Sequence, residues 1–481
     1  MRIAVPLIGE DLPVRRWAAD GSWSYFFLMQ KCLAWRPKLL QAAYSRSLVG
    51  APKSAWSELC SHSSRSIISL SHKRNFHSRV LWDLVETSYC CKSNFPSQRP
   101  TGPAIGTLSC VLHRFPHLSS HNCFPAMSSK SFVIRTPCSS ANIGPGFDVI
   151  GLALSLYLEL HVTIDSSKAW SQEPLNCVIT YDDQSNSTEK ISLDPEVNLI
   201  TRVALYVLRC HDQRSFPAET RVHIKNPIPL SRGLGSSGTA VVAGVVLGNE
   251  VGGLGLSKER LLDYCLMIER HPDNVAASLF GGFVGTYLNE LKPEDVARKE
   301  IPLSEVLPAP AGGIDTGRQP PEPPLGIGHY RKFQWAKEIK AIAIIPDFVV
   351  PTANARNVLP SSYSRADVVF NLQRAALLPA ALGSSPPDPD MIYLAMQDKV
   401  HQPYRQTLIP GLTEVLQSMT PSTQPGLLGI CLSGAGPTIL ALATDRFSEI
   451  ADRIIARFTS QGIACQWKLL EPAQDGTVVQ H

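Results

Sequence analysis

A loop of glycines and serines at residues 226–238, which reads NPIPLSRGLGSSG, constrains the fold of this chain more than any other feature. Gly233 and Gly235 can adopt positive φ angles and let the backbone approach a ligand closely. The sequence predicts a helix directly after the loop, over residues 239–247. Backbone N–H groups and the positive end of that helix would face the same point, so we expect the loop to bind phosphate.

The predicted helix is rich in small residues. Ala240, Ala243 and Gly244 suit close packing against a neighbouring element. Ser236 and Ser237 precede the helix, and serine is a residue type that commonly caps a helix N-terminus.

Three interpretations of the loop compete. Gly233, Gly235 and Gly238 match the G-x-G-x-x-G spacing of dinucleotide-binding folds, but Pro227 and Pro229 interrupt the buried strand that such a fold requires. The GxxxxGK[ST] loop does not fit, because no lysine follows these glycines. A tight turn capped by serines and a phosphate-binding loop remain, and the density of glycines favours the second.

Strands and helices alternate on both sides of this loop. Residues 156–164 alternate apolar and polar side chains, which predicts a strand with one exposed face, and residues 221–225 predict a short strand. A helix is expected from Ser257 to about Arg270, because a proline follows two residues later.

The second half of the chain shows the same mixture. Strands are predicted at residues 341–345, 426–432 and 438–443, with a last strand at 465–469. Helices are predicted at residues 365–378 and 448–460. Pro379 would end the first of these helices. Strands of alternating polarity mixed with helices indicate an α+β chain with helices on one side of open sheets.

The length of 481 residues allows roughly three domains. A proline- and glycine-rich stretch at residues 308–324 indicates a surface insertion with a lobe boundary close to it. We therefore divide the chain into residues 1–126, 127–305, 306–335 and 336–481. These parts are an N-terminal extension, a lobe that carries the phosphate loop, the insertion and a C-terminal lobe.

Charge and cysteine content limit the classes of function. The net charge of +4 is unevenly distributed. Residues 1–126 contain 15 Lys and Arg and six Asp and Glu, whereas the remaining residues contain 30 Lys and Arg and 35 Asp and Glu. The basic balance therefore gives no reason to expect nucleic-acid binding by the main body. No run of eighteen uncharged apolar residues occurs, so we expect no membrane span. The twelve cysteines show no zinc or disulfide spacing, which favours a reducing compartment.

Residues 1–126 lack a sustained period of two or 3.6 residues. Two interpretations stay open for them. One is an extension that is disordered or arises from a misplaced start codon, and the other is an organelle-targeting peptide. Basic residues around an apolar segment at residues 25–29 favour targeting, whereas Glu10, Asp11 and Asp20 oppose it.

Three segments resemble the motifs of the GHMP small-molecule kinases, in the order expected for that superfamily. Residues 229–237 resemble its nucleotide motif, residues 139–148 (SSANIGPGFD) its N-terminal motif, and residues 433–438 (SGAGPT) its C-terminal glycine loop. The resemblance covers residues 131–470. It implies a two-lobed fold with a mixed or antiparallel sheet in the N-terminal lobe and a ferredoxin-like C-terminal lobe.

Within the superfamily the chain is most similar to the homoserine kinase family. Six segments carry this resemblance: residues 137–148, 151–154, 271–276, 281–283, 352–360 and 405–411. The short link between Glu269 and His271 differs from the longer spacing of some bacterial forms. It indicates a eukaryotic, and specifically a fungal, form.

The resemblance implies a nucleotide and metal site. The ATP-binding loop comprises Pro229, Leu230, Ser231, Arg232, Gly233, Leu234, Gly235, Ser236, Ser237 and Gly238, and the C-terminal glycine loop comprises Ser433, Gly434, Ala435 and Gly436. Ser237 and Glu269 would share a Mg²⁺ ion that bridges the phosphates of ATP, because Mg²⁺ accepts hydroxyl and carboxylate oxygens. A solvated charge pair between Glu269 and Arg270 is the alternative.

The implied acceptor is an amino acid with a side-chain hydroxyl. Its candidate ligands are Asn142, Asp148, His271, Asn274, Thr352, Arg356 and Arg405. Arg356 and Arg405 offer the planar double donors that a carboxylate prefers, and two solvated surface charges are the alternative. Asp148, Asn142 and Asn274 offer oxygen acceptors for the ammonium, and a turn-capping Asp148 is the alternative.

The resemblance implies ATP-dependent phosphorylation of L-homoserine to O-phospho-L-homoserine in threonine biosynthesis. We expect direct transfer, and Asp148 as general base is the alternative. The resemblance also implies a homodimer. We expect a cytoplasmic location, with organelle targeting by the extension as the alternative. Two other functions stay open: another kinase of the superfamily, such as a mevalonate kinase, and a nucleotide-binding sensor of the same fold without turnover.

Overall fold

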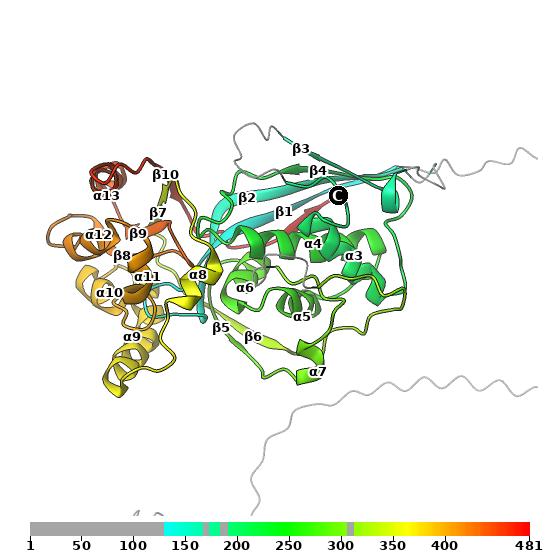
Figure 1. Cartoon of the computed structure of the whole chain (residues 1–481). Coiled ribbons are helices and arrows are strands. Elements are labelled where there is room, and N and C mark those ends of the chain that lie inside the picture. Colours follow the sequence, from blue (N-terminus) through cyan, green and yellow to red (C-terminus); the bar gives the residue numbers. More distant parts are fainter. Residues whose placement is uncertain (1–128, 166, 168–172, 183–190, 305–311) are drawn as a thin grey trace, which may run out of the picture. The chain divides into compact units, whose positions relative to one another are not determined.

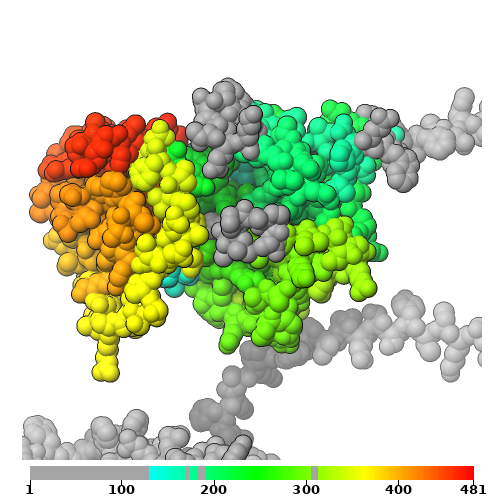
Figure 2. Space-filling model, viewed as in Figure 1, coloured from blue at the N-terminus to red at the C-terminus, as the bar shows by residue number. Residues whose placement is uncertain are grey.

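The computed structural model describes residues 129–165, 167, 173–182, 191–304 and 312–481 (Figure 1). The predictions for residues 1–126 therefore lie outside the described residues. Two sheets organise the described chain, one built mainly from its first half and one from its second half. In Figure 2 the C-terminal segments, yellow to red, lie beside the earlier segments, cyan to green.

The first sheet has seven strands. They are β1 (Lys130–Ala141), β2 (Ile150–Ile164), β3 (Cys177–Tyr181), β4 (Thr220–Lys225), β5 (Phe283–Leu288), β6 (Gly328–Phe333) and β11 (Val478–Gln480). Their order is β11-β1-β2-β4-β3, and β5 pairs with both β2 and β6. Among the described strands of this sheet, β3 and β4 are the one parallel pair, so the sheet is mixed, as the resemblance implied.

Strand β2 shows how the sequence pattern builds this sheet. Leu158, Leu160, Val162 and Ile164 are buried, while the residues between them are partly or fully exposed, which confirms the predicted alternation. The strand begins earlier than predicted, at Ile150, because residues 150–154 are buried as well. A Cβ atom at Gly151 would lie 2.0 Å from the carbonyl oxygen of Asp273, so a helix packs directly on this part of the strand.

Helices lie on one side of the first sheet (Figure 1). They are α3 (Leu199–Cys210), α4 (Ser236–Gly252), α5 (Lys258–Ile268) and α6 (Pro272–Phe280), and the shorter η1 (Pro174–Asn176) and α7 (Pro293–Val296) also belong to this part of the chain. Helix α3 approaches α4 so closely that a Cβ atom at Gly244 would lie 2.5 Å from the carbonyl oxygen of Ile200. The predicted close packing of the small-residue helix is confirmed.

The second sheet has four antiparallel strands. They are β7 (Lys340–Pro346), β8 (Leu427–Leu432), β9 (Ile439–Ala443) and β10 (Cys465–Leu470), in the order β10-β7-β9-β8. The helices of this part are α8 (Thr352–Asn357), α9 (Arg365–Gly383), α10 (Pro389–Ala395), α11 (Gln402–Arg405), η2 (Gln406–Leu408), α12 (Leu412–Ser418) and α13 (Phe447–Thr459). Numbered within the lobe, the strand order is 4-1-3-2, and helices follow the first and third strands, which is the ferredoxin-like arrangement.

Three local predictions were wrong. Ser236 and Ser237 do not cap α4, because Gly235 occupies the N-cap position with φ of 63° and the two serines are the first residues of the helix. Pro379 does not end α9, which continues to Gly383 because Leu378, Ala381 and Leu382 are buried in the core on both sides of the proline. The strand at residues 465–470 is not the last, because β11 returns to the first sheet and pairs with β1.

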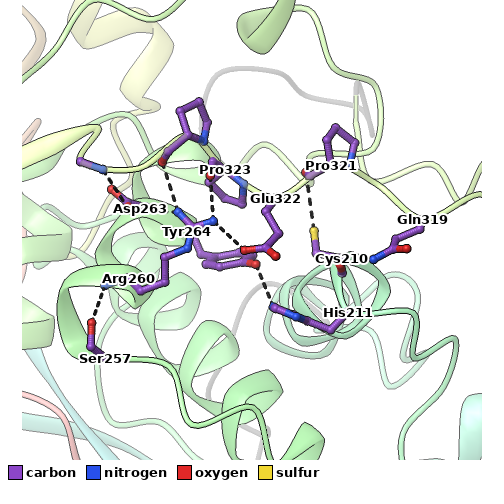
Figure 3. Close-up of polar contacts among 12 residues, drawn as sticks. Cys210, His211, Ser257, Arg260, Asp263, Tyr264, Gln319, Pro321, Glu322 and Pro323 are labelled. Carbon is purple, nitrogen blue, oxygen red and sulfur yellow. Dashed lines mark hydrogen bonds and ion pairs between the residues drawn. The ribbon is translucent and has the colours of Figure 1, made fainter. Parts of the chain in front are cut away.

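The segment that contains Gln319, Pro321, Glu322 and Pro323 crosses over residues of α3 and α5, and we call residues 319–324 the strap (Figure 3). Arg260 of α5 donates to Glu322 and to the carbonyl oxygens of Pro323 and Pro324. Cys210 of α3 donates to the carbonyl oxygen of Pro321. The strap is therefore fastened to two helices, and β6, which follows it, pairs with β5 in the first sheet.

Across the described residues, none of the helices has the length and apolar character needed to cross a membrane.

Candidate active site

A cavity of about 650 Å³ is lined by residues from both halves of the described chain. The predicted site residues that line it are Asn142, Asp148, Leu230, Ser231, Arg232, Gly233, Gly235, Ser236, Ser237, His271, Asn274, Thr352, Arg356, Arg405, Gly434, Ala435 and Gly436. The other predicted residues, Pro229, Leu234, Gly238, Glu269 and Ser433, are not among the lining residues. The fold thus collects at one cavity side chains that are almost 300 positions apart in sequence.

The glycine loop lines the cavity at a position that requires glycine. At Gly235, φ is 63°, and a Cβ atom would lie 2.1 Å from Oγ of Ser139 and 2.8 Å from Oδ1 of Asn274. Helix α4 begins at the next residue, so its N-terminal N–H groups and its positive end face the cavity lining. This arrangement suits an anion such as a phosphate.

The C-terminal glycine loop lies against the first one. Ser433 Oγ donates to the carbonyl oxygen of Gly233 at 2.6 Å and lies 2.8 Å from Oγ of Ser140. The N–H of Gly434 donates to the carbonyl oxygen of Ala141 at 2.9 Å. The three motif segments found in the sequence are therefore in direct contact, and the buried Ser433 joins them rather than lining the cavity.

Arg232 differs from the rest of its loop. Its guanidinium donates to the carbonyl oxygen of Pro346 at 2.7 Å and to Asp347 Oδ1 at 3.0 Å. These residues lie at the end of β7, so Arg232 ties the glycine loop to the second sheet. The guanidinium is thus already engaged by protein oxygens.

Glu269 is the centre of a hydrogen-bond network at the edge of the cavity. Its Oε2 accepts from Ser237 Oγ at 2.8 Å and from the hydroxyl of Ser304, and its Oε1 lies 2.5 Å from Nδ1 of His271. The side chain is 2% exposed. Ser304 was not predicted, because it follows a region without a recognisable motif and only the fold brings it to Glu269.

Burial alone would favour the neutral form of Glu269. The hydrogen bonds and positive field of His271, together with the two serine hydroxyls, outweigh that effect and lower the pKa of the Glu269 carboxyl. The carboxylate and the Ser237 hydroxyl are hard oxygen donors of the kind that Mg²⁺ takes, usually one or two protein groups beside phosphate oxygens and water. The residues present therefore fit Mg²⁺. The predicted alternative, a solvated pair of Glu269 with Arg270, is wrong because Glu269 is buried and hydrogen-bonded elsewhere.

A second charged cluster lies around Phe147. Nη2 of Arg356 donates to both carboxylate oxygens of Asp148, at 3.0 and 3.2 Å, and each side chain is about one-third exposed. The backbone N–H of Asp148 donates to Oδ1 of Asn142 at 2.8 Å, which holds Asp148 at a positive φ of 53°. A cation and an anion that face each other at the cavity match the two charges of an amino-acid zwitterion.

Arg405 approaches the same ring from α11. Its guanidinium carbon lies 5.0 Å from the centroid of Phe147, and that of Arg356 lies 5.8 Å from it. Arg405 is 2% exposed and donates to the carbonyl oxygens of Ala355 and Gly434. Burial lowers the pKa of the Arg405 guanidinium to about 10, so it stays charged at neutral pH. The predicted alternative of two solvated surface charges is wrong for this buried arginine.

The fully buried Asp273 was not predicted as part of the site. Its carboxylate accepts from the N–H of Asn142 at 3.3 Å and of Asn274 at 2.9 Å, and so joins the loop after β1 to the start of α6. Burial, and then repulsion by Asp148, raise the pKa of Asp273 to about 7. The only indication in the sequence was that Asp273 lies within residues 271–276, a segment that resembles the homoserine kinase family.

Other parts of the cavity are more apolar. Tyr181, Leu199, Ile200 and Ala240 line it together with Asn198 and Asn226. The amide of Asn198 donates to the hydroxyl of Tyr181 at 2.8 Å. These side chains were not predicted as site residues. Tyr181, Asn198, Leu199 and Ile200 belong to no motif, Asn226 only begins the loop segment, and Ala240 was expected to pack against a neighbouring element.

Comparison with known proteins identifies the family. Residues 198–282 match the GHMP kinases N terminal domain, and residues 387–461 match the GHMP kinases C terminal domain. Homoserine kinase of Saccharomyces cerevisiae is 62% identical over 353 residues, which cover 73% of this chain and 99% of that protein. The chain belongs to the homoserine kinase family.

Further relatives agree with this assignment. Homoserine kinase of Candida albicans is 52% identical over 359 residues, which cover 74% of this chain and 99% of that protein. The crystal structure of homoserine kinase from Cytophaga hutchinsonii has a TM-score of 0.55 at 25% identity and covers 73% of this chain and 97% of that one. The predicted GHMP fold is confirmed, and the similarity to fungal members of the homoserine kinase family agrees with the prediction of a fungal form.

Proposed function

We propose that this chain is an ATP-dependent homoserine kinase that phosphorylates the side-chain hydroxyl of L-homoserine to O-phospho-L-homoserine, in threonine biosynthesis. One observation carries the proposal. A glycine loop at a helix N-terminus and a cluster of Arg356, Arg405 and Asp148 line the same cavity. The first suits the phosphates of ATP, and the second suits the carboxylate and ammonium of an amino acid.

In this proposal the loop at residues 229–238 holds the triphosphate through backbone N–H groups and the positive end of α4. The apolar part of the cavity, around Tyr181 and Leu199, takes the adenine ring, and the nearby asparagines offer hydrogen bonds. Ser433, Gly434, Ala435 and Gly436 support the loop from the other side. Arg232 contributes by fastening the loop to the end of β7.

Ser237 and Glu269 would hold Mg²⁺, with His271 and Ser304 orienting the carboxylate. The ion would neutralise phosphate charge during transfer. Glu269 is suited to this role because its lowered pKa keeps it ionised at neutral pH.

Arg356 and Arg405 bind the carboxylate of homoserine, and Asp148, with Asn142 and Asn274, binds its ammonium. Arg356 and Asp148 otherwise pair with each other. In the complex, the substrate carboxylate pairs with Arg356 and the substrate ammonium pairs with Asp148. Thr352 and His271 line the cavity and orient the hydroxyl. Its oxygen forms the new bond to the γ-phosphorus, the bond from that phosphorus to ADP breaks, and the hydroxyl proton is released.

Purified protein with ATP, Mg²⁺ and L-homoserine should release ADP in a coupled assay. With mevalonate in place of homoserine, the rate of ADP release should equal the rate without an acceptor. Mevalonate-dependent ADP release would favour another kinase of the superfamily. ATP binding without homoserine-dependent ADP release would favour a sensor of the same fold.

Arg356→Lys tests the amino-acid site. Lysine keeps the charge but loses the planar pair of donors, so the KM for homoserine should rise about tenfold or more while the KM for ATP changes less than about twofold. Arg365→Lys, the same change on the exposed start of α9, is the control. An equal rise of both KM values would contradict the assignment of Arg356.

Residues 127–305 and 336–481 remain our proposed lobes, with 306–335 as the segment between them. We also propose a cytoplasmic homodimer that binds no nucleic acid. The six cysteines in the described part of the chain are unpaired, which suits a reducing compartment. Light scattering of the purified protein tests the dimer.

A further inference from the structure

His401 is a fully buried histidine behind the amino-acid end of the site. It is 0% exposed, lies at the N-cap position of α11 and is not among the residues that line the cavity. Arg405 lies one helical turn later, and its N–H donates to the carbonyl oxygen of His401 at 3.0 Å. The short segment 401–405 therefore links a proposed substrate ligand to a buried imidazole with no role in the mechanism above.

The imidazole holds the loop that carries Asn142 and Asp148. Nε2 of His401 lies 2.9 Å from the carbonyl oxygen of Gly144, and since a carbonyl only accepts, Nε2 carries the proton. Nδ1 has no hydrogen-bond partner among the described residues. The neutral tautomer with its proton on Nε2 satisfies both observations. Burial agrees with it, because desolvation lowers the pKa of His401.

The same ring also supports Phe147. The His401 and Phe147 rings stack with centroids 5.5 Å apart and an interplanar angle of 23°. The guanidinium carbons of Arg356 and Arg405 lie within 5.8 Å of the Phe147 centroid. Phe147 directly precedes Asp148 in the chain, so the residue whose ring lies near both arginines is also the backbone neighbour of the opposing carboxylate.

A rigid frame keeps His401 in place. The buried carboxylate of Asp398 accepts from the N–H groups of Val400, His401 and Gln402 at 2.7 to 3.0 Å. It also accepts from the side-chain amide of Asn371 at 2.7 Å. Its hydrogen bonds end on the backbone and on a buried amide, and Oδ2 also lies 3.6 Å from Nε2 of His401, so the segment before α11 has little freedom to move.

We propose that His401 is a positioning residue for the amino-acid substrate: by donating to Gly144 and stacking on Phe147, it sets the separation between the arginine pair and Asp148. This separation must match the distance between the carboxylate and ammonium of one amino acid. The inference rests on the proposed function. It predicts that a change at His401 affects homoserine binding and leaves the nucleotide end of the cavity unchanged.

Two amide substitutions provide a matched test. In His401→Gln the side-chain NH₂ group can reach the position of Nε2 and still donate to Gly144. In His401→Asn the NH₂ group reaches only the position of Nδ1, which has no partner. His401→Asn should raise the KM for homoserine about fivefold or more, since a lost hydrogen bond and a displaced ring act together. His401→Gln should stay within about threefold of the wild type, and both variants should keep the wild-type KM for ATP within about twofold.

His329→Asn, the same change at an exposed histidine of β6, is the control for the substitution itself. Thermal unfolding of each variant separates loss of folded protein from loss of positioning. The inference is overturned if the two amides raise the KM for homoserine equally, or if the KM for ATP rises with it. If His401→Asn fails to fold, a wild-type KM in His401→Gln supports the inference and an altered one contradicts it. Absence of homoserine-dependent ADP release by the wild type would instead reject the proposed function.

Discussion

At the scale of single residues, the candidate site places several charges in the interior within networks of hydrogen bonds. Glu269, Asp273 and Arg405 are each almost or fully buried, and each has identified partners. An unpaired charge at such depth would be strongly destabilising, so the neighbours of each group decide whether its ionised or its neutral form is favoured. The two acidic residues show opposite outcomes. Hydrogen bonds lower the pKa of Glu269, whereas burial and a neighbouring carboxylate raise that of Asp273.

Asp273 should therefore make stability depend on pH. Its pKa rises from 3.8 to about 7 on folding, so between these values the folded state holds a proton that the unfolded state has released. This contribution to stability is complete below pH 3.8 and is lost as the pH rises to about 7. Asp273→Asn removes the dependence. The Tm of the wild type relative to that of Asp273→Asn should fall by a few degrees from about pH 4.5 to 7.5.

Differential scanning calorimetry of both proteins across this range is the measurement. Asp475→Asn, which replaces an exposed carboxylate in the same way, is the control. Parallel Tm curves for the wild type and Asp273→Asn would show that the group is ionised in both states.

At the scale of elements, α4 is capped at both ends by glycines with left-handed backbone conformations. Gly235 is its N-cap with φ of 63°, and Gly253 is its C-cap with φ of 61°. Their surroundings differ. A Cβ atom at Gly253 would have no heavy atom within 4 Å, whereas one at Gly235 would meet Ser139 and Asn274. The N-terminal glycine is thus required by both conformation and space, and the C-terminal one by conformation alone.

Alanine at these two positions should separate the two effects. Gly253→Ala should cost about 1 kcal/mol of stability, from the backbone conformation, and leave the kinetics unchanged. Gly235→Ala should in addition displace Ser139 and Asn274 beside the glycine loop. If this loop binds the phosphates as proposed, the KM for ATP should rise about tenfold or more. Steady-state kinetics and urea unfolding of both variants provide the comparison. Equal kinetics for the two variants would mean that the loop tolerates the added methyl group.

At the scale of the whole described chain, the second sheet is followed by a return to the first. After β10, the N–H of Ala473 donates to the carbonyl oxygen of Ala153, and the carbonyl oxygen of Ala473 accepts from the N–H of Gly282. The N–H of Thr477 donates to the carbonyl oxygen of Leu279, and β11 pairs with β1. Strand β1 ends in the segment that contacts both glycine loops. The C-terminal residues therefore stabilise a strand on which the site depends, although none of them lines the cavity.

Deletion of residues 476–481 should lower the Tm by several degrees, because β1 loses one of its two neighbouring strands and Lys258 loses the carbonyl oxygen of Thr477. At 25 °C the KM values for ATP and homoserine should stay within about twofold, since the cavity lining is intact. Deletion of His481 alone is the control. A truncated protein with an unchanged Tm would show that β11 adds nothing to the stability of this sheet.

The sequence by itself determined the α+β class, most strands and helices, and the family. These properties depend on local patterns: alternation of buried and exposed side chains in β2, small residues in α4 and glycines in the loop that precedes it. Such patterns involve residues a few positions apart, so they can be recognised without knowing what lies across the cavity. The errors were also local in kind. Pro379 would end an isolated helix, but buried contacts on both sides of it outweigh the single lost hydrogen bond.

Only the tertiary structure decided which side chains meet. Ser304 contacts Glu269 across 35 positions, His401 contacts Gly144 across 257, and Ser433 contacts Gly233 across 200. Arg232 belongs to the glycine loop by its sequence, but its guanidinium donates to oxygens at the end of β7. The direction of a buried side chain and the pKa of its charge depend on neighbours that the fold brings from distant segments. For that reason the sequence could indicate the residue types of the site but not the networks that orient them.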